Sequence, residues 1–161
     1  MDDEYDIFYL AFGKAVLAAQ GFEFNLGTLL ISLDRLIQGN LTVEALFALD
    51  EKYSRLTMGQ LLVQLRTKIS VSKSIEERLK EGLNNRNFLI HRFYSEEAEC
   101  LISEMNIDKM VNRMDEMRQS LLNADSDVKA LILGIDNISG FPQEFVEQEH
   151  IKLLNKYGRK E

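Results

Sequence analysis

Cysteine and histidine are scarce in this sequence. Its 161 residues include one cysteine, Cys100, and two histidines, His91 and His150. A single cysteine cannot form an internal disulfide, and three widely separated ligands do not make the clusters that hold a structural zinc ion. We therefore expect no metal and no cofactor.

Residues that break helices are also rare. Pro142 is the only proline, tryptophan is absent, and no segment alternates polar and apolar residues with a period of two. Leu, Glu, Lys, Met and Ala are abundant, and 45% of the residues are hydrophobic, which is typical of a soluble globular chain. The composition predicts one all-α domain over residues 1–161, an up-and-down bundle of about five or six helices.

Basic side chains are outnumbered, with 19 Lys and Arg against 26 Asp and Glu, for a net charge of -7. This balance argues against strong non-specific nucleic-acid binding but leaves room for a small local phosphate site. The acidic start, Met1-Asp2-Asp3-Glu4, is unlike the basic start of a signal peptide. We see no apolar run near the roughly 20 residues of a membrane span, so we expect a cytoplasmic protein that does not enter the membrane.

Helical periodicity divides the chain into several segments. Apolar spacing predicts a long first helix over residues 5–37 that ends at Gly39. Gly21 and Gly27 could bend this helix or split it, and close backbone packing would explain their presence. Thr42 is expected to cap a short helix that reaches about Tyr53.

The second half of the chain gives weaker boundary signals. Thr57 is expected to cap a third helix, and Ser72 or Ser74 a fourth. The acidic residues 95–99 suggest a turn or a frayed helix end. A long helix is then predicted from Ile107 to about residue 133, and a last one from Pro142 onward.

Arg86 interrupts the pattern of the fourth helix. Residues at helical spacing predict one apolar stripe formed by Ile75, Leu79, Leu83, Ile90 and Phe93. On an ideal helix that turns about 100° per residue, Arg86 points into the middle of that stripe. A guanidinium is rarely buried without a partner, so a carboxylate should meet it or the stripe should face a partner molecule or a cleft. Glu23, between two phenylalanines, is the preferred carboxylate, and Asp34 is the other one considered.

His91 follows Arg86 after four intervening residues. Arginine can grip a phosphate and histidine can move protons near neutral pH, so the two could cleave RNA without a metal. Side chains five residues apart on an ideal helix diverge by roughly 140°, so the pair can meet only through local distortion or across a symmetric interface. A polar strip lies beside the apolar stripe: Lys80, Asn84, Asn87 and His91. Phe88 is expected to be exposed on the opposite side, as part of a contact surface.

The segment Arg86-Asn87-Phe88-Leu89-Ile90-His91 resembles the signature of HEPN domains, in which a polar residue often follows the Arg and a His comes after four to six residues. The resemblance covers about ten positions and the general helical organisation. It implies a homodimer whose two motifs share a cleft around the Arg86–Tyr94 segment and act as a metal-independent ribonuclease on RNA. Many such proteins look like toxins or defence components.

The resemblance also implies roles for single residues. Arg86 would hold the phosphate, His91 would perform the acid–base chemistry, and Asn87 would orient them. Glu23, expected as the carboxylate partner of Arg86, and Tyr94 are the candidates for supporting positions around them. Some relatives carry a tyrosine two residues after the His that a nucleotidyltransferase antitoxin modifies, but Phe93 stands there in this chain and Tyr94 comes next. The alternative function is a non-catalytic helical dimer that binds a protein or a nucleotide, which the acidic charge favours.

Overall fold

The protein is all-helical throughout the residues that the computed structural model describes, which are 2–39, 42–102, 106–139 and 151. The helices are α1 (Asp2–Gln38), α2 (Val43–Ser54), α3 (Met58–Lys68), α4 (Lys73–Asn87), α5 (Phe93–Ile102) and α6 (Ile107–Ile138). A π-helical turn, η1 (Phe88–Arg92), joins α4 to α5 without a break. The helical bundle that the composition predicts is therefore confirmed, with five separate rods in the described part of the chain.

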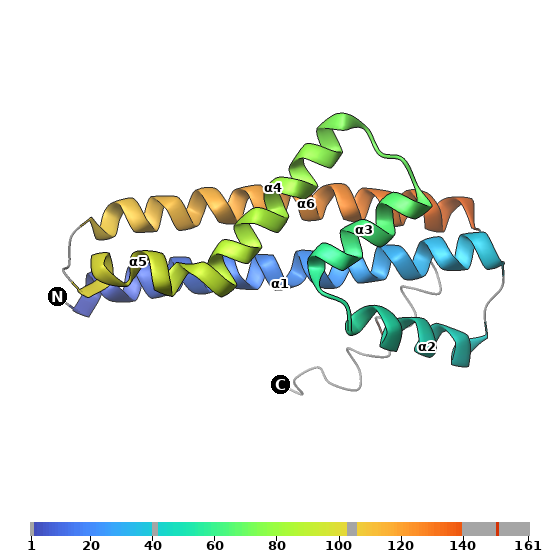
Figure 1. Ribbon diagram of the computed structural model, residues 1–161, viewed down its shortest axis with the longest axis horizontal. Coiled ribbons are helices and arrows are strands. Elements are labelled where there is room, and N and C mark those ends of the chain that lie inside the picture. Colours follow the sequence, from blue (N-terminus) through green and yellow to red (C-terminus); the bar gives the residue numbers. More distant parts are fainter. Residues whose placement is uncertain (1, 40–41, 103–105, 140–150, 152–161) are drawn as a thin grey trace.

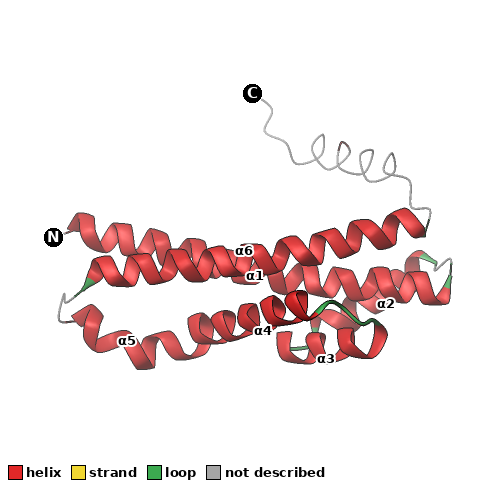
Figure 2. Ribbon diagram, turned by 90° about the horizontal axis from the view of Figure 1, so that it is seen from above, coloured by secondary structure: helices red, strands yellow, loops and turns green. Residues whose placement is uncertain are grey.

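Two long helices form the backbone of the bundle. Helices α1 and α6 run side by side in the same direction, and the continuous rod α4–η1–α5 returns in the opposite direction (Figures 1 and 2). An ion pair between Arg35 and Asp136 (2.9 Å) ties the carboxyl-terminal ends of α1 and α6 together. Helices α2 and α3 lie beside the carboxyl-terminal half of α1 (Figure 1). The core lies between these elements, with Phe22, Leu26, Leu79, Met114 and Leu121 fully buried.

The predicted helix starts are confirmed by their caps. The hydroxyl of Thr42 accepts a hydrogen bond from Ala45 N–H, and that of Ser72 accepts one from Ile75 N–H. Thr57 and Gln60 form a reciprocal capping box at the start of α3. Helix α1 ends where expected, because Gly39 takes the left-handed conformation with φ of 82°.

Three local expectations are wrong. Helix α1 continues through Gly21 and Gly27, and a Cβ added at either would meet nothing within 4 Å, so close packing is not their role. Close packing occurs instead at Gly82, where an added Cβ would lie 2.6 Å from the Phe22 ring and 3.2 Å from Ala124. Residues 95–99 belong to α5 rather than to a turn, because the helix continues through η1.

The predicted last helix lies outside the described residues, apart from Ile151, which is exposed. Helix α6 extends five residues beyond the predicted end at residue 133, to Ile138.

Helix α1 also bears on the membrane question. The stretch Tyr5–Gln38 is long and apolar enough to cross a membrane by length and composition, with a mean hydropathy of 1.3 in its best window. The expectation that no segment is long and apolar enough to span a membrane is wrong, because apolar residues on several sides of α1 together raise its mean hydropathy. In this fold α1 is a core helix that packs along α6, and core helices of soluble proteins pass the same test. A cytoplasmic location stays a prediction.

Candidate active site

The π-helical turn brings Arg86 and His91 together within one chain. The backbone N–H of Phe93 donates to the carbonyl of Phe88, a bond that spans five residues instead of four. The helix therefore turns less per residue here, and side chains five apart approach the same face. Arg86 Nη1 and His91 Nε2 lie 2.9 Å apart. Of the two routes considered for this pair, local distortion is the one observed.

Glu23 of α1 holds the other edge of the Arg86 guanidinium. Arg86 Nε donates to Glu23 Oε2 (3.1 Å), and Nη2 donates to both carboxylate oxygens (2.9 and 3.2 Å). The Arg86 side chain is only 17% exposed. The bidentate ion pair with Glu23 offsets the free-energy cost of removing the guanidinium from water. The carboxylate partner expected from the sequence is present, and it is Glu23 rather than Asp34.

The Nη1 edge of Arg86 faces the other two motif residues. Nη1 donates to Asn87 Oδ1 (3.3 Å) as well as contacting His91 Nε2. Arginine can only donate hydrogen bonds, so His91 Nε2 is the acceptor, and the neutral ring carries its proton on Nδ1. Asn87 and His91 thus both take their orientation from Arg86, which Glu23 fixes to α1.

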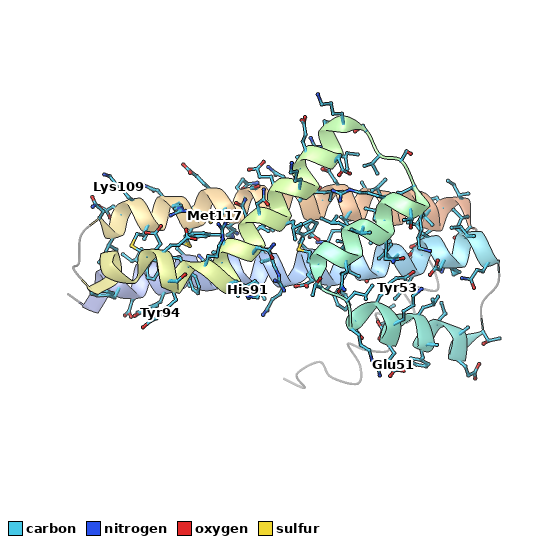
Figure 3. The ribbon with its side chains drawn as sticks, viewed as in Figure 1. Glu51, Tyr53, His91, Tyr94, Lys109 and Met117 are labelled. Carbon is cyan, nitrogen blue, oxygen red and sulfur yellow. The ribbon has the colours of Figure 1, made fainter. Side chains whose placement is uncertain are left out.

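An open pocket of about 560 Å³ lies in front of this group. Its walls come from the start of α3 and from the end of α4 with η1: Thr57, Met58, Gly59, Asn84, Arg86, Asn87, His91 and Arg92. His91 stands where α4 runs into α5, on the side toward the start of α3 (Figure 3). Three of the four residues of the predicted polar strip line this pocket; Lys80 does not.

The start of α3 adds positive potential to the pocket. The first N–H groups of a helix have no partner inside the helix, and the helix dipole makes this end partly positive. In the Thr57–Gln60 box, Thr57 N–H donates to Gln60 Oε1 (2.8 Å) and Gln60 N–H donates to Thr57 Oγ1 (3.3 Å), while Met58 and Gly59 line the pocket. Arg86 and Arg92 also line the pocket, so positive groups gather here in an otherwise acidic chain.

The π turn also overturns two sequence predictions. Phe88, expected to be exposed, is only 3% exposed, and Ile90, expected in the buried stripe, is 41% exposed. Both predictions assumed an ideal α-helix through residue 93. The wider turn changes which positions face inward, and the buried residues become Phe88, Leu89 and Phe93.

Tyr94 lies apart from the hydrogen-bonded group. Its side chain is 80% exposed on the outside of α5, and it makes no polar contact with Arg86, Asn87 or His91 (Figure 3). Phe93, by contrast, packs into the core against Phe12, with ring centroids 4.7 Å apart.

Sequence reasoning missed the contribution of α3 and of Arg92. Thr57 marked the start of α3 as an expected cap, but nothing in the sequence indicated that this helix end faces the motif. Asp34, the carboxylate not used by Arg86, instead accepts hydrogen bonds from Tyr53 Oη (2.5 Å) and from Lys68. That buried network joins α1 to α2 and α3.

No family model, no curated protein and no solved structure matches this chain. Within the described part of the chain, no group of three or more His, Cys, Asp or Glu side chains is placed to hold a metal ion.

Proposed function

We propose that the protein is a metal-independent endoribonuclease of the HEPN type that is active as a homodimer and serves as a toxin or defence component. The observation that carries the proposal is the 2.9 Å contact between Arg86 Nη1 and His91 Nε2 at an open pocket. Glu23 occupies the Nε and Nη2 edge of the guanidinium and leaves the Nη1 edge toward the pocket. A phosphate oxygen can replace His91 as the acceptor of that edge.

This exchange gives the pair its chemistry. When a phosphate takes the Nη1 donor, the lone pair of His91 Nε2 is freed to accept the proton of the 2′-OH next to the scissile phosphate. The 2′-oxygen then forms a bond to phosphorus and the bond to the 5′-oxygen breaks. Arg86 stabilises the charge on the phosphate oxygens. The leaving oxygen takes up a proton from the imidazolium so formed, or from the His91 of a second copy. The products are a 2′,3′-cyclic phosphate and a free 5′-OH.

The dimer is supported by the surface beside the motif. Ile90 and Tyr94 are both well exposed on the same rod as Arg86, although neither lines the pocket. A second copy covering this segment would bury them and place two pockets together. The structure makes the Arg86–His91 contact within one chain, so the dimer is needed for a shared cleft and not for the pair itself. Before the dimer forms, the exposed Tyr94 would be open to a nucleotidyltransferase antitoxin.

One observation favours the alternative, a non-catalytic helical dimer that binds a protein or nucleotide. Every polar atom of the Arg86 guanidinium already has a partner: Glu23, Asn87 and His91. In such a protein the same group would serve only to hold α1 against η1. The acidic net charge of -7 points the same way.

Cleavage of a single-stranded RNA by the purified full-length protein in EDTA separates the two functions. Arg86→Ala and His91→Ala should each lower the rate by roughly 100-fold or more, because acid–base catalysis contributes about 10²- to 10⁴-fold. Arg55→Ala is the control, since Arg55 is an exposed arginine of a surface ion pair outside the pocket. Sedimentation should give a dimer for all four proteins. Equal cleavage rates in wild type and the two motif variants would reject the ribonuclease and favour the non-catalytic binding function.

A further inference from the structure

The π turn is held by contacts that the chemistry of the pocket does not itself require. A π-helical turn is rare and persists where its surroundings favour it. Its first residue is Phe88 and its closing N–H comes from Phe93, so the positions of these two rings define the turn that carries His91. The two rings meet edge to face, with centroids 6.0 Å apart.

Phe88 is covered by the guanidinium of Arg113 from α6. The Arg113 Cζ lies 4.2 Å from the centroid of the Phe88 ring, the spacing of a cation stacked on an aromatic face. A second cation, Arg92 at the end of the π turn, lies 5.6 Å from the same ring. Arg113 in turn forms an ion pair with Glu97 of α5. Helix α6, helix α5 and both ends of the turn therefore meet at one buried ring.

We propose that Arg113, oriented by Glu97 and stacked on Phe88, is a positioning residue that holds the π turn and so keeps His91 Nε2 against Arg86. Arg113 lines no part of the pocket and would not touch RNA there. Its planar guanidinium can stack on the ring and bind the carboxylate at the same time, which a lysine ammonium cannot do as well. The effect on catalysis rests on the proposed function; the effect on His91 does not.

The contact between His91 and Arg86 can be monitored through the ¹⁵N resonances of the His91 ring, which report its tautomer. In ¹⁵N-histidine-labelled full-length protein with His150→Gln, the one remaining imidazole is that of His91. At alkaline pH the wild-type ring should show the Nδ1–H tautomer, because Nε2 accepts from Arg86. Arg113→Met should shift the nitrogen resonances toward a mixture of tautomers, and Arg113→Lys should restore them only in part.

Arg78→Met is a matched control. Arg78 pairs with Asp127 between α4 and α6, and its side chain is 41% exposed, against 42% for Arg113. It lies two helical turns before Arg86, away from the π turn. Arg78→Met should therefore lose an equivalent ion pair and keep the wild-type tautomer. The inference is overturned if Arg113→Met and Arg78→Met give the same His91 spectrum. If Arg113→Met does not fold, Phe88→Leu removes the aromatic ring on which Arg113 stacks and should give the same change in the His91 spectrum.

RNA cleavage then separates this inference from the proposed function. If the wild type cleaves RNA, Arg113→Met should lower kcat by roughly 10- to 100-fold, the size expected for a catalytic group displaced by about 1 Å, with little change in KM. If the wild type does not cleave RNA, the proposed function fails, and the tautomer measurement still decides the role of Arg113.

Discussion

Arg86 and Glu23 lie 63 residues apart in sequence, yet the guanidinium of one and the carboxylate of the other share three hydrogen bonds of 2.9 to 3.2 Å. This contact fixes the motif rod to α1. It also leaves one edge of the guanidinium, the Nη1 edge, for His91 and for a substrate.

Glu23→Gln should destabilise the fold and lower any RNA cleavage. The amide keeps the shape of the side chain but replaces one acceptor oxygen with a donor that faces the donors of Arg86. Losing a charge-assisted pair that is largely buried should cost about 1–3 kcal/mol in the free energy of unfolding, measured in urea. Glu51→Gln, in an exposed ion pair on α2, should change it by less than about 0.5 kcal/mol. Equal losses for the two variants would show that Glu23 is an ordinary surface carboxylate.

Gly82→Ala should destabilise the protein through crowding. The new Cβ would sit 2.6 Å from the fully buried Phe22 ring and 3.2 Å from Ala124, so α4 must move away from α1 and α6. Overpacking of this kind costs about 1–3 kcal/mol in the free energy of unfolding. Gly134→Ala in α6, where an added Cβ meets nothing within 4 Å, should instead stabilise by about 0.4–1 kcal/mol. Chemical denaturation of both variants checks the opposite signs.

Asp34→Asn should remove part of the acid sensitivity of the fold. Burial raises the pKa of the Asp34 carboxyl, but hydrogen bonds from Lys68 and Tyr53 outweigh it, and the net pKa lies below its ordinary value. A carboxyl with a lowered folded-state pKa contributes stability that is complete above the unfolded pKa of about 3.9 and is lost as pH falls through the folded value.

Urea unfolding at pH 7 and pH 3 tests this. Asp34→Asn should be less stable than wild type at pH 7, and the difference should shrink at pH 3. Tyr53→Phe removes one hydrogen-bond donor to Asp34 and leaves Lys68 in place, so its stability at pH 7 should lie between those of wild type and Asp34→Asn. A difference that stays constant across this range would contradict the lowered pKa as a source of stability.

Thr57→Ala should affect the pocket as well as the stability of α3. Losing an N-cap hydroxyl costs about 0.5–2 kcal/mol in the free energy of unfolding. Thr42→Ala removes the same kind of cap from α2, with the same 3.3 Å hydrogen bond, but lies outside the pocket. Both variants should lose similar stability, and only Thr57→Ala should weaken RNA binding, measured by fluorescence anisotropy. Parallel losses in both would mean that the start of α3 does not contact RNA.

The sequence predicts the helices of this protein well because their signals are local. Caps at Thr42, Thr57 and Ser72 and the left-handed Gly39 each depend on a few neighbouring residues. The carboxylate partner of Arg86 could also be inferred, because a part-buried guanidinium needs one. What could not be inferred is the π turn, since its cause lies in the packing of Phe88 and Phe93 against distant helices.

That one omission explains the errors around the motif. An ideal α-helix places Phe88 outside, Ile90 inside and His91 away from Arg86, and the structure reverses all three. The position of the α3 start next to the motif could not be predicted either, because it depends on how the short helices α2 and α3 pack on α1. The function, the dimer and the RNA substrate are proposals that the experiments above decide.

The parallel pairing of α1 with α6 has a kinetic consequence. Asn25 bonds to Asp125 and Arg35 to Asp136, so the first helix packs against residues 100 and 101 positions later. Contacts so distant in sequence slow folding compared with bundles of neighbouring helices. At about 5–20 residues per second, a ribosome needs about 5–20 s to add those hundred residues. Glu23, Arg86 and His91 all precede α6 in the chain, so the residues of the pocket are synthesised before the helix that packs along both α1 and α4.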